Sequence, residues 1–156
     1  MSRLHCKEMF QNKWYQSMLP NLSPALQMDI AAHCYRHTFS SIWFFTVGDK
    51  EEESRFFNQL SLVLDPRVFC PEEFLFQRGE RATDLYIVAK GLIFAKGKVY
   101  RNGHVLGEDM ILSVGRRIHD ALAVTYVDVF CLSKDSLNEV FDNGDFKKIY
   151  RKVRSA

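Results

Sequence analysis

The chain has few cysteines, and they form no recognisable motif. Cys6, Cys34, Cys70 and Cys131 are far apart, no two of them form a CxxC pair, and no metal-ligand spacing is present. The opening segment MSRLHCKEMFQNKWYQ also lacks the apolar centre of a secretory signal peptide. We therefore expect reduced thiols in a cytosolic setting and no bound metal.

Long apolar runs and a strong net charge are absent too. The longest apolar candidate, SSIWFFTV at 40–47, is far shorter than the roughly 18 residues of a membrane span. The net charge of +2 is too small to indicate binding to nucleic acid or to a membrane surface by itself. Serine, cysteine and histidine are too scattered to suggest a nucleophilic centre, so we expect no enzyme.

What the chain does contain is typical of a globular protein. Its 156 residues are 47% apolar and 26% charged, which is enough for one domain, or for one domain with a helical extension. Thirteen Phe, six Tyr and two Trp predict a core rich in aromatic side chains.

The first part of the sequence predicts helices. Ser23 is a candidate N-cap with Pro24 at the first helical position, and apolar residues then recur at helical spacing. A second helix is expected to start at Asp49, with Glu52 completing a capping box, and to end before Pro66.

After Pro66 the sequence predicts short strands and then helices again. Four β-rich runs are separated by turn residues, and Asn102-Gly103 is the usual signal for a type I′ hairpin. Ser133 is expected to cap a helix that ends at Gly144, and a last helix follows. The predicted fold class is α+β: an antiparallel, jelly-roll-like β-roll flanked by N-terminal and C-terminal helices.

The segment HVLGEDMILSVGRRIHD at 104–120 carries the candidate site. Gly107 permits close approach of a ligand to the backbone, and the residues after it can open a helical turn with free N–H groups. Arg117 could close on an anion with a forked hydrogen bond, and Glu108 could accept hydrogen bonds from sugar hydroxyls. These residues suggest a sugar-phosphate pocket, but they leave open an exposed turn with solvated charges.

Several motifs resemble the cyclic nucleotide-binding domain, and the channel type most closely. PRVFCPEEFLFQRGERATDLYIVAKGLI at 66–93 is similar to the opening strands of the family, although the first turn, Pro71-Glu72-Glu73, lacks the usual glycine. GEDMILSVGRRIHDALAVTYVDVFCLS at 107–133 aligns with the phosphate-binding cassette and the strands after it without a gap. LPNLSPALQMDIAAHCYRHTF at 19–39 resembles the end of the C-linker of these channels.

The resemblance implies a division of the chain into three parts. Residues 1–64 would be C-linker-like helices and the helix before the roll, and 65–133 the β-roll with its cassette at 106–119. Residues 134–156 would be the C-terminal helices, the last of which acts as a lid over the ligand in the family. The chain would be the cytoplasmic part of a larger channel or transporter, and the N-terminal helices could support a homo-oligomer.

The resemblance also implies a role for each cassette residue. Glu108 would take the ribose 2′-hydroxyl, Arg117 the cyclic phosphate, and backbone amides near Asp109 and Met110 would assist. Tyr100 would be a wall for the base. The implied site is Tyr100, Gly107, Glu108, Asp109, Met110, Arg116, Arg117, Ile118 and His119, with cAMP, or else cGMP, as ligand and no cofactor.

Three residues of the cassette depart from the family pattern. Met110 replaces a small residue, Ile118 replaces Thr or Ser, and His119 replaces Ala. The missing hydroxyl at 118 favours cAMP over cGMP. An alternative is a homology domain that binds no nucleotide, in which Glu108 pairs with Arg117 and the domain acts in structure or subunit interaction. A DNA-binding regulator is disfavoured because no helix-turn-helix follows the roll.

Overall fold

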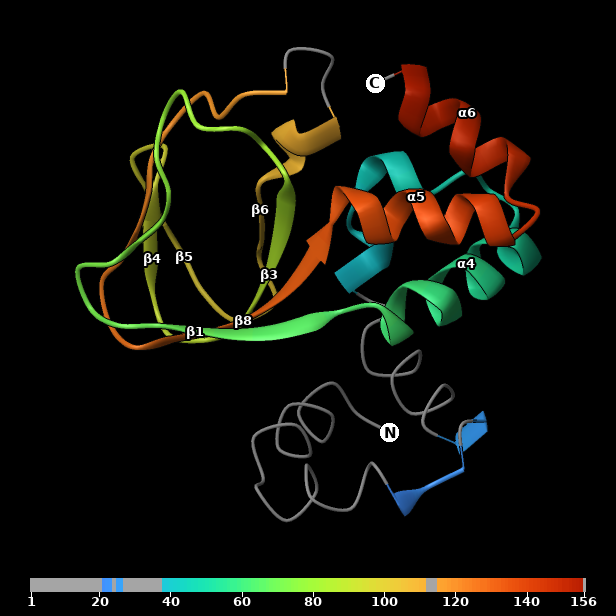
Figure 1. Cartoon of the computed structure of the whole chain (residues 1–156), viewed down its shortest axis with the longest axis horizontal. Coiled ribbons are helices and arrows are strands. Elements are labelled where there is room, and N and C mark those ends of the chain that lie inside the picture. The colour runs from blue at the N-terminus through green and yellow to red at the C-terminus, as the bar shows by residue number, and fades with distance from the viewer. Residues whose placement is uncertain (1–20, 24, 27–37, 112–114, 156) are drawn as a thin grey trace.

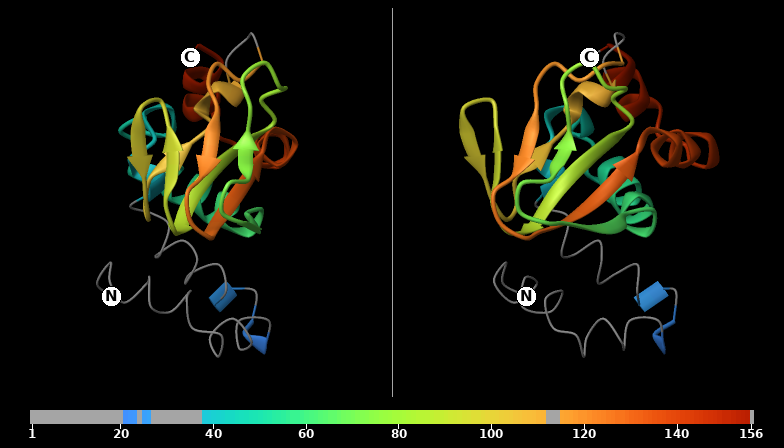
Figure 2. Two further views of the ribbon diagram at one scale, coloured as in Figure 1. Left: turned by 90° about the vertical axis from the view of Figure 1, so that its left-hand side faces the viewer. Right: turned by 60° about the vertical axis from the view of Figure 1, so that its left-hand side comes forward.

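A computed structural model of the chain describes residues 21–23, 25–26, 38–111 and 115–155. Two antiparallel sheets form a roll, and the helices lie together at one side of it (Figures 1 and 2). Residues 25–26 and 38–40 are helical, and the named helices are η2 (Trp43–Phe45), α4 (Lys50–Leu62), η3 (Glu108–Ile111), α5 (Lys134–Asn143) and α6 (Lys147–Ser155). This arrangement confirms the expected α+β fold with an antiparallel β-roll.

The eight strands among the described residues divide evenly between the two sheets. They are β1 (Asp65–Phe69), β2 (Phe74–Phe76), β3 (Asp84–Lys90), β4 (Ile93–Ala95), β5 (Lys98–Tyr100), β6 (Val105–Leu106), β7 (Ala121–Ala123) and β8 (Val127–Ser133). One sheet has the order β1-β8-β3-β6 and the other β2-β7-β4-β5, and every pair is antiparallel. The β3–β8 pairing is the longest, with partners from Asp84↔Ser133 to Lys90↔Asp128.

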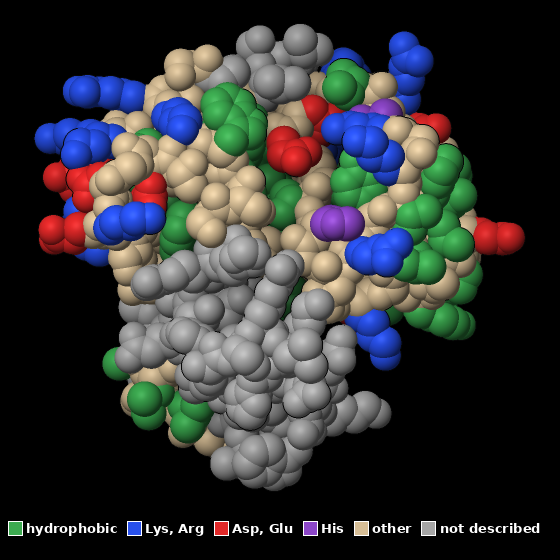
Figure 3. Space-filling model, turned by 180° about the vertical axis from the view of Figure 1, so that it is seen from behind, with side chains coloured by type: hydrophobic (Ala, Val, Ile, Leu, Met, Phe, Trp, Pro, Cys, Tyr) green, Lys and Arg blue, Asp and Glu red, His purple; other side chains and the backbone are tan. Residues whose placement is uncertain are grey.

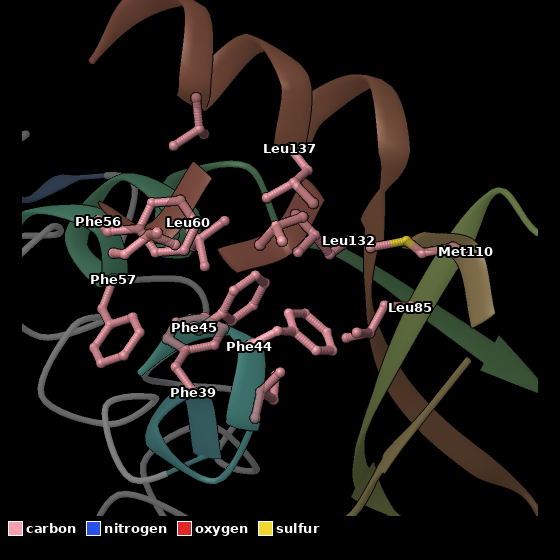
Figure 4. Close-up of a cluster of buried hydrophobic side chains, with 14 of the residues drawn as sticks. Phe39, Phe44, Phe45, Phe56, Phe57, Leu60, Leu85, Met110, Leu132 and Leu137 are labelled. Atoms are coloured by element: carbon pink, nitrogen blue, oxygen red, sulfur yellow. The ribbon is translucent and has the colours of Figure 1, made fainter. Parts of the chain in front are cut away.

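Strand β3 is buried on both faces because the first sheet is the middle layer of the molecule. Leu85 and Ile87 belong to a core shared with the helices, whereas Tyr86 and Val88 belong to a second core inside the roll. Alternate side chains of a strand point to opposite faces, so one strand serves both cores. Figure 4 shows the helical core, in which labelled Phe side chains from the η2 and α4 region meet Leu85 and Leu132.

The expected hairpin at Asn102-Gly103 is not present. A turn forms there, but the strands it joins lie in different sheets, because β5 pairs with β4 and β6 pairs with β3. The tight hairpin instead joins β4 to β5 through Lys96 and Gly97, whose φ angles are +55° and +71°. Positive φ at both central residues is the requirement of a type I′ turn.

The expected helix caps are present in the described residues. Ser23 Oγ accepts from Leu26 N, Asp49 accepts from Glu52 N, and Ser133 Oγ accepts from Ser136 N. Most of the helix predicted after Ser23 lies in 24 and 27–37, outside the described residues, as does the opening segment 1–20. Within the described part of the chain, no helix has the length and apolarity to cross a membrane.

The capping box predicted for Glu52 is wrong. Its carboxylate is buried and accepts from the backbone N–H of Lys148 at 2.9 Å and of Ile149 at 3.1 Å. These amides belong to the first turn of α6, where a helix has no internal acceptors for its N–H groups. Glu52 therefore caps α6 from α4, about a hundred residues away in sequence, instead of closing its own helix.

Candidate functional site

Gly107 is the point where β6 turns into η3, and the site is built around it. Its φ of +88° is a conformation that residues with a side chain rarely adopt. A Cβ atom at this position would lie 2.7 Å from the Asp84 carbonyl oxygen and 2.8 Å from Nη1 of Arg117. Glycine is thus required both by the turn and by the arginine that passes against it.

Arg117 is the central side chain of this region, and only 3% of its surface is exposed. Its Nη2 donates to the Asp84 carbonyl at 2.6 Å and its Nη1 to the Gly107 carbonyl at 3.2 Å. The guanidinium carbon lies 4.1 Å from the centroid of the Phe76 ring, which it covers. Main chain and aromatic ring together fix the guanidinium in one orientation.

The Nε–H group of Arg117 takes no part in these contacts. Among the described residues Nε is buried and has no hydrogen-bond partner. Buried donors are nearly always satisfied in folded proteins, so an unpaired one calls for an explanation. An anion that reaches the guanidinium would supply the missing acceptor.

Asp109 supplies the negative charge next to Arg117. Its Oδ1 accepts from Nη1 of Arg117 at 2.6 Å, and its Oδ2 accepts from the Ile118 backbone N–H at 3.3 Å. Both side chains are buried. The alternative prediction that Glu108 pairs with Arg117 is therefore wrong. Arg117 does form an ion pair inside the protein, but with the neighbouring Asp109.

Glu108 lies on η3 but faces another part of the molecule. It lines a cavity of about 320 Å³ together with residues of the η2 region and of the turn before β6, among them Thr38, Trp43 and His104. Arg117 is not one of the described residues that line this cavity.

The face of the molecule seen in Figure 3 carries charged side chains of both signs together with apolar ones, so no single charge dominates this face.

The three departures from the family pattern have different environments. Met110 is fully buried in the helical core, beside Leu85 and Leu132 (Figure 4). Ile118 is 59% exposed, and its side chain contributes nothing to the core. His119 is half-buried, and its ring stands edge-on to Phe76 at 5.4 Å between centroids.

His119 has both ring nitrogens buried without a partner among the described residues. Burial lowers the pKa of His119 below its ordinary value, and the positive charges of Lys96 and Arg117 lower it further. The imidazole is therefore neutral at pH 7. A neutral ring offers one donor and one acceptor beside Phe76, the ring that the Arg117 guanidinium covers.

Arg116 and Tyr100 take less central positions. The Arg116 side chain is exposed and donates from Nη1 to the Gly79 carbonyl at 2.8 Å. The turn at Gly79-Glu80 is also bonded to the main chain of Arg117, through Gly79 N to Arg117 O and Arg117 N to Glu80 O, both 2.8 Å. Tyr100 lies on β5, packs against the core inside the roll and contacts His104 edge-on.

The sequence does not reveal every residue that positions Arg117. The carbonyl of Asp84 and the ring of Phe76 are brought to it by strands β3 and β2, and neither carries a motif for this contact. The carboxylate of Asp109, next to Glu108, was a visible signal for the ion pair. Among the described residues no group of His, Cys, Asp and Glu could hold a metal.

Comparison with known proteins places this geometry in context. Residues 66–143 match the family model described as "Cyclic nucleotide-binding domain". The chain is 28% identical over 137 residues to the cyclic nucleotide-gated channel cone photoreceptor subunit alpha of Gallus gallus, covering 80% of the chain and 18% of that protein. It is 28% identical over 148 residues to cyclic nucleotide-gated channel alpha-2 of Rattus norvegicus, covering 86% and 22%. The chain thus spans about a fifth of the length of these relatives.

Proposed function

Because the chain belongs to the cyclic nucleotide-binding domain family, we propose that it binds a cyclic nucleotide and regulates a larger channel or transporter. The observation that carries the proposal is Arg117, a buried guanidinium whose Nε has no hydrogen-bond partner among the described residues. A cyclic phosphate is the anion that this family binds, and the Nε–H group, which lies outside the ion pair with Asp109, is a donor that such an anion could use. The role is regulatory and not enzymatic.

In the proposed complex, Arg117 binds the cyclic phosphate, and Glu108 turns from the cavity that it lines to accept a hydrogen bond from the ribose 2′-hydroxyl. The turn at Gly107, with the backbone of Asp109 and Met110, surrounds the phosphate, Arg116 borders it, and Tyr100 lies beside the base. The exposed aliphatic side chain of Ile118 offers no hydroxyl to guanine, and His119 stands at the phosphate. The proposed preference is therefore for cAMP over cGMP.

Coupling to the rest of the protein would run through α6. This helix is held against the N-terminal elements: Lys148 Nζ pairs with Asp49 at 2.6 Å, Lys152 Nζ donates to the Thr46 carbonyl, and Glu52 caps its first turn. A nucleotide that favours another position of α6 would change these contacts. It would thereby shift the equilibrium between two arrangements of α6 and the N-terminal helices. Such couplings are typically about 1–3 kcal/mol. The domain would act on the cytoplasmic side of a membrane, and copies of it would contact one another through the N-terminal helices.

A second candidate function is a domain that binds no nucleotide and serves in structure or subunit interaction. The ion pair between Asp109 and Arg117 favours it, because the charge of Arg117 is already compensated inside the protein. The two candidates differ in whether an external anion can reach the guanidinium.

Calorimetric titration of the chain with cAMP, and separately with cGMP, tests the proposal. We expect saturable binding that Arg117→Ala weakens at least tenfold, about 1.4 kcal/mol. Arg67→Ala is the matched control, since it removes the same charge from an exposed position on β1. No binding of either nucleotide at millimolar concentration would overturn the proposal in favour of the nucleotide-free domain.

The role of Glu108 is tested with 2′-deoxy-cAMP. If Glu108 binds the 2′-hydroxyl, the unchanged chain should bind 2′-deoxy-cAMP more weakly than cAMP. The Glu108→Ala variant should bind the two ligands with equal affinity. Equal loss of affinity for both ligands in the variant would mean that Glu108 acts elsewhere, such as in the cavity beside Trp43.

A further inference from the structure

We propose that Asp109 determines the affinity of the nucleotide site, because its carboxylate occupies the anion position on Arg117 and a cyclic phosphate must displace it. This inference rests on the proposed function and adds a competitor to it. The site would then be closed by its own side chain in the absence of ligand. The affinity for the nucleotide would depend on how much more strongly the Arg117 guanidinium binds the cyclic phosphate than the Asp109 carboxylate.

The contacts of Asp109 are those of a bound anion. One carboxylate oxygen takes a guanidinium N–H of Arg117 at 2.6 Å, and the other takes the backbone N–H of Ile118 at 3.3 Å. A charged side chain and a main-chain amide are also the donors that hold phosphate oxygens in proteins. Carboxylate and phosphate therefore compete for the same two donors.

The other acceptors around Arg117 are less able to leave. The carbonyl of Asp84 belongs to β3, which is paired on both sides, with β8 and with β6. The carbonyl oxygen of Gly107 also accepts a hydrogen bond from the backbone N–H of Met110 at 3.1 Å, which holds it in the turn. Among the described acceptors of Arg117, only Asp109 is held through a rotatable side chain, so it can move away while the backbone stays in place.

Burial makes this competition strong. The exposed fractions of the Arg117 and Asp109 side chains are 1% and 4%, so solvent screens their attraction little. A neutral ligand group could not replace the carboxylate without leaving the guanidinium uncompensated. The site would therefore accept only ligands that bring an anionic group to Arg117, and it would bind them more weakly than a site without Asp109.

Calorimetric titration of Asp109→Asn with cAMP is the test. The amide keeps the size of the side chain and an oxygen acceptor but removes the competing charge, and we expect cAMP to bind at least tenfold more tightly than to the unchanged chain. Asp65→Asn is the control, since it removes one carboxylate from an exposed pair on β1. Equal cAMP affinity of the unchanged chain and Asp109→Asn overturns this inference but leaves the proposed function intact. No binding by either chain overturns both.

A measurement on the unchanged chain covers the case in which Asp109→Asn does not fold. The carboxyl ¹³C signal of Asp109 and the amide signal of Ile118 are followed by NMR during titration with cAMP. Displacement predicts that both signals shift with the saturation of binding, while the carboxyl signal of Asp65 stays unchanged. Saturable binding with both site signals unmoved would show that Asp109 keeps its place, and would overturn the inference.

Discussion

The cap that Glu52 places on α6 gives a prediction about how firmly the last helix is held. We consider Glu52→Ala, which removes the acceptor of two backbone N–H groups at 2.9 Å and 3.1 Å. A hydrogen bond to a charged group contributes about 1.5–3 kcal/mol, and loss of a helix cap costs about 0.5–2 kcal/mol. Water can reach the freed amides once α6 loosens, so we expect a combined loss of about 2 kcal/mol.

The assay is hydrogen exchange of the α6 amides under native conditions. A loss of about 2 kcal/mol corresponds to roughly thirtyfold faster exchange by local opening of the helix. Glu51→Ala is the matched control, because Glu51 is exposed on the same turn of α4 and, within the described part of the chain, makes no hydrogen bond with α6. If the α6 amides exchanged at the same rate in both variants, the reasoning that Glu52 anchors the helix would be refuted.

Three further predictions concern the site. Because the pKa of His119 is lowered in the folded state, the unfolded chain binds a proton first as pH falls below about 6.5, and the free energy of unfolding should decrease from there to the pKa of the folded state. His119→Leu should remove this pH dependence of the free energy of unfolding, measured by urea titration at several pH values. An unchanged pH dependence in the variant would contradict the prediction. Met110→Ala should lower the free energy of unfolding by about 2–5 kcal/mol, because it leaves a cavity in the helical core, and a loss below 1 kcal/mol would mean that Met110 is not packed there. Gly107→Ala should destabilise the fold more than Gly97→Ala, since both have positive φ but only at 107 would a Cβ meet Arg117; equal thermal unfolding of the two variants would contradict this contact.

Local signals in the sequence predicted the helices well. Asp49 and Ser133 cap helices where their residue types indicated, and α4 ends before Pro66 as expected. These features depend on neighbours within one or two turns of the chain. A sequence pattern contains that information directly.

Contacts between distant segments could not be predicted in the same way. The bond from Glu52 to α6 spans 96 residues, and a capping box was the reasonable local interpretation of the same glutamate. The hairpin at Lys96-Gly97 was missed because lysine seldom adopts the positive φ of +55° that it has here. In both cases the tertiary structure selects a state that local preference does not favour.

The candidate site was partly predictable. The sequence indicated the positions of Glu108 and Arg117 but not their orientations, and the structure points them to different surroundings. Asp109 was expected to contribute its backbone, whereas its side chain makes the ion pair with Arg117. Which of two adjacent carboxylates reaches the arginine depends on the rotation of the η3 turn, and that rotation is set by the burial of Met110 in the core.

A crystal structure of the chain with cAMP would test whether Arg117 is the phosphate-binding residue of a cyclic nucleotide site. We expect the cyclic phosphate within hydrogen-bond distance of the Arg117 guanidinium, with the Asp109 carboxylate displaced. Nucleotide bound in the cavity beside Glu108 and Trp43 without contact to Arg117, or crystals that hold no nucleotide while the Asp109–Arg117 pair stays intact, would contradict it.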